Sequence, residues 1–286
     1  MLQIALADYR LLKLARIFSK SRFVPKLYAL NSITNPGFYY KFLSDIKLRN
    51  AVFKTTTPSR FKDMEGILVK YFRPGRRYCI HDIAVSNGIS SVELHDLLKK
   101  NNIDFELNIS DKFSRGYFRG RFLQTVYDAT MTPLNYYFCG IYLRHGDAGN
   151  LLCRKLHAFM CRHEKSAVKK PVKEFSFYHP ETLMLLLKQG LRVLEYDIFE
   201  TGITEKFDFV RAMNILNRVY FPDDAIVKAL RLIKNSVKNE GVFLVGRSGP
   251  DGVNRAGFFK KCDNKFIVME DYNTGSEIKD LVLNID

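Results

Sequence analysis

The sequence predicts an α/β protein built on a doubly wound, seven-stranded and mostly parallel sheet. From about residue 78 onward, short apolar runs alternate with amphipathic helical patterns, which is the order that builds a parallel sheet. A loop of small residues follows the first apolar run, where α/β sheets bind their ligands. Two further apolar runs near the end of the chain are joined by a tight turn and predict a closing antiparallel hairpin.

Composition favours a folded protein of a reducing compartment. The chain has 286 residues, of which 47% are apolar and 26% charged, enough for one core domain with an extension. The five cysteines are odd in number and irregularly spaced, so we expect no disulfide framework. No apolar run approaches the roughly 20 residues of a membrane-spanning helix, and no signal peptide is visible. We therefore expect a cytoplasmic protein without a transmembrane segment.

The positive charge is concentrated at the amino-terminal end. Residues 1–80 hold 16 Lys and Arg against 4 Asp and Glu, whereas the whole chain has a net charge of +15. Such an asymmetry indicates an anionic partner, which would be a nucleic acid, an acidic membrane surface or a charged glycan. The alternative is a solvated basic surface that keeps the protein soluble.

The amino-terminal segment, residues 1–75, is expected to be helical. Residues 4–20 form an amphipathic pattern with four cations opposite the apolar face. This helix would pack on the core or lie on an anionic membrane, which would make the protein peripheral to the membrane. A second helix is expected over 60–72, and it should end before Pro74.

Residues 76–286 carry the sheet. We expect strands at 78–83 and 104–109, with a helix between them that starts at the capping-box spacing of Ser90 and Glu93. An insertion at about 112–175 should contain a hairpin and a helix. Its strands are expected at 122–127 and 136–143, and its helix at 148–163.

The alternation resumes after the insertion. A helix is expected at 180–189, followed by strands at 191–196 and 207–212. The next helix should open at Pro222 and close at Gly241, before a strand at 242–245. The last hairpin should pair 257–260 with 265–269 across the turn Cys262-Asp263-Asn264.

The run from Tyr78 to Gly88 carries the functional signal. It is an apolar strand pattern that ends in Asp82, followed by small residues at alternate positions, Ala84, Ser86 and Gly88. Small side chains leave room for a ligand against the backbone at a strand end. This run resembles motif I of the class I methyltransferases that use S-adenosylmethionine (SAM), with Ala84 and Ser86 in place of the first two glycines. The resemblance implies a SAM cofactor and a methyltransferase activity.

Later residues fit the same family in the same order. Asp111 follows the second strand and matches the acid that binds the ribose hydroxyls of SAM. Asp197 matches the acid near the adenine amino group, and Ile198 would pack on the ring. The run from Phe207 to Phe221 resembles the fourth-strand region of chemotaxis-receptor-type methyltransferases, in which Asn214 would face the methionine end of the cofactor.

The sequence narrows the acceptor only partly. Amine methylation of nucleobases goes with an Asn-Pro-Pro-aromatic tetrad, whereas Arg211-Ala-Met-Asn214 stands at that position, and no Cys adjoins a Pro for cytosine-C5 chemistry. This favours O-methylation of a small molecule, a glycan or a lipid-linked acceptor. The alternatives are an RNA methyltransferase, suggested by the aromatic and basic residues near the amino-terminal end, and a non-catalytic protein that kept the fold. Neither the general base nor the oligomeric state can be assigned.

One group of metal-ligating residues falls on the helix expected at 148–163. Cys153, His157 and Cys161 are spaced to share a face, with His163 nearby. Four ligands on one straight helix cannot surround a metal tetrahedrally. We therefore expect no metal site.

Overall fold

The computed structural model describes residues 56–119, 123–138, 141–144, 172–194, 196–200 and 202–285, and a few positions between 154 and 162. The expected helix at 4–20 lies outside these residues. The chain forms two compact units. The larger comprises Thr56–Lys112 and Tyr178–Asp286, and the described part of the smaller lies within Phe113–Phe177.

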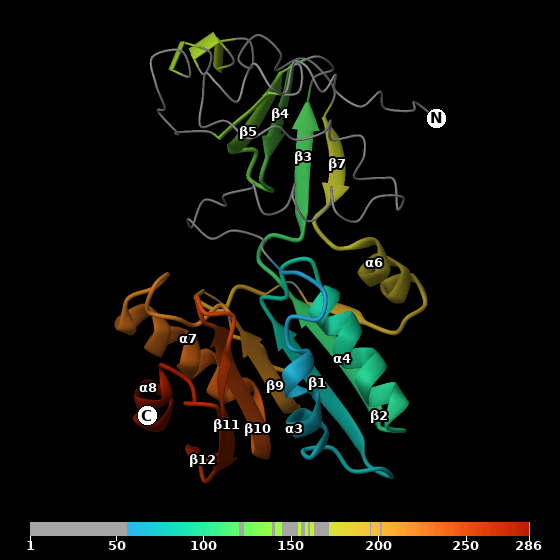
Figure 1. Cartoon of the computed structure of the whole chain (residues 1–286), viewed down its shortest axis with the longest axis vertical. Coiled ribbons are helices and arrows are strands. Elements are labelled where there is room, and N and C mark those ends of the chain that lie inside the picture. The colour runs from blue at the N-terminus through green and yellow to red at the C-terminus, as the bar shows by residue number, and fades with distance from the viewer. Residues whose placement is uncertain are drawn as a thin grey trace. The chain divides into compact units, whose positions relative to one another are not determined.

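The larger unit contains the predicted seven-stranded sheet, in the order β12-β11-β10-β9-β1-β2-β8 (Figure 1). The five strands from β8 to β10 are parallel, and β11 and β12 add an antiparallel hairpin. The strand order reverses between β1 and β9, which makes their carboxyl ends the topological switch point. The predicted fold class is therefore confirmed. The strands are β1 (Arg77–Ile83), β2 (Asp104–Ser110), β8 (Arg192–Leu194), β9 (Phe207–Met213), β10 (Val237–Ser248), β11 (Asn254–Cys262) and β12 (Lys265–Tyr272).

Helices cover both faces of this sheet (Figure 1). Successive residues of β10 point alternately, so that Phe243 and Val245 join one hydrophobic cluster and Leu244 joins the other. One cluster packs under α3 and α4, and the other under α7 and α8. The helical elements are η2 (Lys62–Met64), α3 (Glu65–Val69), α4 (Ile89–Lys100), α6 (Pro180–Leu187), α7 (Asp223–Ser236) and α8 (Lys279–Leu283).

Two predicted helix boundaries in the larger unit were wrong. The helix expected at 60–72 is a 3-10 turn followed by the five-residue α3, anchored by the buried Met64 and Leu68. The helix expected to end at Gly241 ends at Ser236, and the chain passes directly into β10. Val237 is buried and pairs with Phe207 of β9, so sheet pairing takes over before the glycine is reached.

The closing hairpin is confirmed, and its turn has a clear local cause. Asp263 and Asn264 have φ values of 46° and 63°, both in the left-handed region. Two such residues form the tight turn that matches the twist of a β-hairpin, and Asp and Asn tolerate this conformation. The turn therefore sets the register of β11 against β12.

The smaller unit contains a five-stranded antiparallel sheet, in the order β6-β5-β4-β3-β7. Its second strand was expected at 136–143, but this stretch is divided between β5 and β6, which pair with each other. Most of the helix expected at 148–163 lies outside the described residues. The strands are β3 (Arg115–Arg119), β4 (Leu123–Tyr127), β5 (Pro133–Phe138), β6 (Ile141–Arg144) and β7 (Lys173–Ser176).

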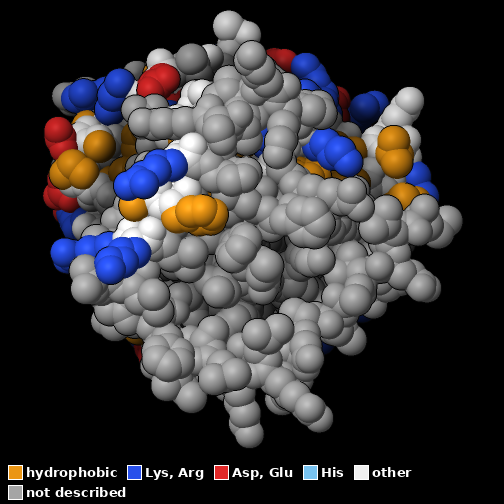
Figure 2. Space-filling view, turned by 90° about the horizontal axis from the view of Figure 1, so that it is seen from above, with side chains coloured by type: hydrophobic (Ala, Val, Ile, Leu, Met, Phe, Trp, Pro, Cys, Tyr) orange, Lys and Arg blue, Asp and Glu red, His pale blue; other side chains and the backbone are white. Residues whose placement is uncertain are grey.

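The surface of the described residues is mixed in character. Figure 2 shows Lys and Arg side chains with hydrophobic side chains beside them. Among these residues, no helix combines the length and the apolar character that crossing a membrane requires.

Candidate functional site

The loop after β1 has an unusual backbone. Ala84, Ser86 and Gly88 have φ values of 56°, 61° and 78°, so alternate residues adopt the left-handed conformation. Glycine enters this region freely, whereas a side chain makes it costly. Ala84 and Ser86 thus keep a loop shape that favours glycine, and the loop lies at the switch point of the sheet.

The loop is tied to the end of the neighbouring strand. The Val85 N–H donates to the Ser110 carbonyl at 3.1 Å, and the Ser86 N–H donates to Asp111 Oδ2 at 2.7 Å. The structure therefore brings Ser86 and Asp111 together, as expected if both belong to one site. Asp111 is held by the backbone of the loop, which fixes its carboxylate in place.

Asp82 is not open to a ligand. Arg211 donates to both of its carboxylate oxygens, from Nε to Oδ1 at 2.9 Å and from Nη2 to Oδ2 at 2.5 Å. Ser91 Oγ also donates to Oδ2, at 2.6 Å, and Arg211 Nη2 donates to the Ser90 carbonyl at 2.9 Å. Both side chains of the pair are only 4% exposed. Asp82 therefore forms a buried ion pair with Arg211, and this role of Arg211 was not predicted from the sequence.

Gly88 is required by a neighbouring helix. A Cβ atom at this position would lie 2.5 Å from Thr182 Cγ2 and 2.9 Å from its Oγ1. Thr182 Oγ1 and the His179 N–H both donate to the Asn87 carbonyl, at 3.0 and 2.8 Å. The first turn of α6 is thus fastened to the loop, which gives Gly88 a packing role in addition to the cofactor role suggested by the resemblance.

Asp197 and Ile198 follow β8 and have structural partners. Asp197 Oδ1 accepts the Phe199 N–H at 3.0 Å, and Asp197 Oδ2 lies 2.5 Å from Lys112 Nζ. The hydrogen bond to Asp197 is the largest contribution that raises the pKa of Lys112. Ile198 is buried in the hydrophobic cluster under α7. Because Lys112 directly follows Asp111, the ion pair links the ends of β2 and β8.

Asn214 joins the ends of β9 and β10. Its φ is 62°, its N–H donates to the Gly246 carbonyl at 2.8 Å, and its Oδ1 accepts the Ser248 N–H at 2.8 Å. The side chain therefore shapes the backbone at this edge.

His81 is a buried core residue of β1. It is fully buried, its Nε2 lies 2.8 Å from Ser110 Oγ, and its ring packs against Tyr196 and Phe207. Burial lowers the pKa of His81 to about 4, so the imidazole is neutral at physiological pH. His179 begins α6, where its Nδ1 accepts the Glu181 N–H at 3.3 Å.

The residues described by the structure contain no group of three or more metal-ligating side chains. Of the four ligands considered from the sequence, Cys161 is described, whereas Cys153, His157 and His163 lie outside the described residues.

No family model and no curated protein matches the sequence. Among solved structures, the chain is similar to the CMeT domain of a citrinin polyketide synthase, at 12% identity and a TM-score of 0.33, over 65% of this chain and 34% of that one. It is also similar to the mitomycin 7-O-methyltransferase MmcR, at 13% identity and a TM-score of 0.35, over 68% of this chain and 38% of that one. A protein of Pyrococcus horikoshii OT3 matches at 14% identity and a TM-score of 0.37, over 85% and 87% of the two chains.

The chain spans little more than a third of the length of the first two. Similarity at this level carries no information about substrate or activity.

Proposed function

We propose that the larger unit binds SAM at the carboxyl edge of its sheet and transfers the methyl group to an acceptor. The observation that carries this proposal is the left-handed loop 84–88 at the switch point, tied through the Ser86 N–H to Asp111. Crevices at switch points are where doubly wound sheets bind their ligands. The loop has a backbone conformation that glycines adopt freely, and the Asp111 carboxylate beside it can accept hydrogen bonds from the hydroxyls of a ribose.

In this proposal the residues have different roles. Asp111 accepts from the ribose hydroxyls, because a carboxylate can receive two hydrogen bonds and the Ser86 N–H orients it. Asn214 shapes the edge facing the methionine end. Asp197 and Ile198 border the adenine end, and Asp197 reaches the adenine amino group only after it releases Lys112, whose side chain is 48% exposed. Asp82 acts through Arg211 on the loop and does not contact the cofactor.

Bound SAM would supply a reactive methyl sulfonium. The contribution of the protein is then to hold the acceptor in line with that methyl group and to exclude water. We further propose an oxygen acceptor, because Arg211-Ala-Met-Asn214 replaces the tetrad typical of base-amine methylation. Strong RNA binding with a steep salt dependence would contradict this choice of acceptor and favour RNA instead.

Calorimetry of the full chain with SAM and S-adenosylhomocysteine tests cofactor binding. Replacing Asp111 by Asn should weaken binding by about 1–3 kcal/mol, because the ribose hydroxyls lose their charged acceptor. Asp104→Asn is the matched control, since Asp104 lies exposed at the other end of β2 and should leave affinity unchanged. The proposal fails if the parent protein binds no SAM or if Asp111→Asn binds as the parent does. SAM binding without turnover on any acceptor class would indicate a non-catalytic protein.

A further inference from the structure

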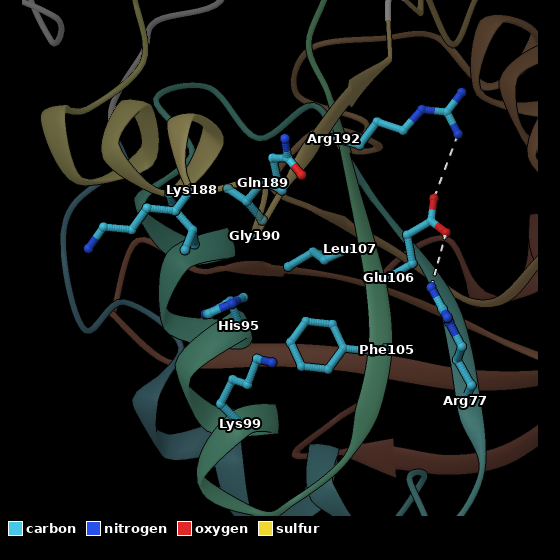
Figure 3. A pocket seen from close by; sticks show the side chains of 12 residues that line it. Arg77, His95, Lys99, Phe105, Glu106, Leu107, Lys188, Gln189, Gly190 and Arg192 are labelled. Atoms are coloured by element: carbon cyan, nitrogen blue, oxygen red, sulfur yellow. Dashed lines mark ion pairs between the residues drawn. The ribbon is translucent and has the colours of Figure 1, made fainter.

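A cleft of about 600 Å³ opens at the amino edge of the larger unit's sheet, at the opposite end of the strands from the loop 84–88 (Figure 3). It arises because β8 pairs with β2 only over Asn108–Ser110. Within the described part of the chain, residues 104–107 of β2 have no strand on that side. The end of α6 and residues 188–191 form one wall, and α4 forms another.

The floor of the cleft is aromatic. The Phe105 ring faces α4, where the His95 ring meets it edge-on, with centroids 5.4 Å apart (Figure 3). The Lys99 ammonium lies 5.6 Å from the centroid of the same ring. A ring that carries a cation above it and borders open space can accept a second planar group.

The residues that line the cleft carry more positive than negative charge, although Arg192 also pairs with Glu205 at 3.0 Å. Arg77, Lys99, Lys188 and Arg192 line it, and Glu106 is the only acid among the lining residues. Glu106 is shared by the two arginines, at 3.9 Å from Arg77 Nη2 and 3.6 Å from Arg192 Nη1. Among the described residues, neither Lys99 nor Lys188 has a carboxylate partner.

Lysines near the carboxyl termini of helices are common, because they offset the negative end of the helix dipole. Lys99 and Lys188, at the ends of α4 and α6, fit that pattern. Two features go beyond it. The Lys99 ammonium lies over an aromatic ring that lines the cleft, and the volume of the cleft falls within the roughly 300–1,000 Å³ typical of small-molecule sites.

We propose that this cleft binds a small planar aromatic anion. The ring of the ligand would stack on Phe105, and its anionic group would pair with Lys99. His95 Nε2 faces the cleft beside Gly190, 3.3 Å from where a Cβ of that residue would lie, and adds a polar atom to the wall. Binding here does not depend on SAM, because the residues involved lie at the other end of the strands.

Calorimetry of the full chain with phenyl phosphate tests the proposal, with benzyl alcohol as the ring-only probe and inorganic phosphate as the anion-only probe. Phenyl phosphate should bind at least about tenfold more tightly than either of these. Benzoate, compared with phenyl phosphate, distinguishes a carboxylate ligand from a phosphate ligand.

Matched variants locate the site. Lys99→Gln should weaken phenyl phosphate binding by about fivefold or more, whereas Lys100→Gln, an exposed neighbour outside the cleft, should leave it unchanged. Phe105→Leu should weaken binding while the folded state persists, as shown by circular dichroism. An absence of saturable binding, equal binding of inorganic phosphate, or equal effects of the two lysine variants would overturn the proposal. None of these results depends on SAM binding.

Discussion

Removing Arg211 should strongly destabilise the larger unit. Asp82 and Arg211 are register partners in β1 and β9, and both side chains are only 4% exposed. Arg211→Met would leave the Asp82 carboxylate buried with only the Ser91 hydroxyl as a donor from its present partners. Removing one partner of a buried ion pair costs about 3–5 kcal/mol, because the remaining charge is neither solvated nor neutralised.

The cost of the unpaired buried charge can be separated from the cost of lost packing. In Asp82→Leu with Arg211→Met, no charge is left buried, so the double variant should recover about 2 kcal/mol relative to Arg211→Met alone. Arg192→Met is the control for an exposed arginine, whose ion pair with Glu205 involves side chains that are 56% and 43% exposed. That variant should cost less than about 1 kcal/mol.

The assay is urea unfolding followed by far-ultraviolet circular dichroism, since the chain has no tryptophan to report by fluorescence. The reasoning is refuted if Arg211→Met costs no more than Arg192→Met. It is also refuted if the double variant is as unstable as Arg211→Met, because the buried charge would then not be the cause.

Two further predictions concern the loop and the core. Gly88→Ala should destabilise the fold by about 1–3 kcal/mol, since its Cβ would overlap Thr182 in addition to the left-handed strain. Gly252→Ala is the control for backbone strain alone, because Gly252 has a φ of +77° and a Cβ there would meet nothing within 4 Å. Equal unfolding midpoints for the two variants would contradict the packing role of Gly88. Burial lowers the pKa of His81 from 6.5 to about 4. The free energy of unfolding therefore keeps its full value above about pH 6.5, where His81 is neutral in both states. It falls by about 3 kcal/mol as the pH drops towards 4, because the unfolded chain then binds a proton that the buried imidazole does not. His81→Leu should remove this part of the pH dependence in urea titrations, and an unchanged acid limb would count against it.

The parallel sheet could be predicted because its signal is local. Apolar runs of strand length alternate with helical periodicity, and each such pattern can be recognised without knowing its neighbours. The loop 84–88 was also recognisable, because small residues at alternate positions reflect a backbone that side chains strain. The structure brings Asp111 beside this loop, since strand ends in a parallel sheet share one edge, and its role in binding a ribose stays a prediction.

The missed features depend on pairing between distant segments. Arg211 meets Asp82 only because β9 lies next to β1 in one particular register. The sequence did contain a signal for this ion pair. One apolar strand holds an acidic residue and another apolar strand holds a basic residue. Thr182 against Gly88 offered no such signal, because the contact depends on how closely α6 approaches the loop. The end of α7 was misjudged because Gly241 is a strong local stop, whereas the pairing of Val237 with Phe207 is not local.

The buried pair also determines which charges act at the proposed cofactor edge. Since Arg211 neutralises Asp82 within the core, the charges near the ends of β2 and β8 include Asp111, Lys112, Asp197 and Glu200. Lys112 binds Asp197 and not Asp82. Releasing Lys112 therefore leaves Asp82 paired with Arg211 and the loop 84–88 unchanged. A cationic sulfonium ligand would favour an edge where this lysine is already engaged by a carboxylate. Glu200 Oε1 lies 3.7 Å from Lys112 Nζ and would keep this lysine paired once Asp197 turns to the adenine amino group, while Asp111 keeps the position set by the Ser86 N–H.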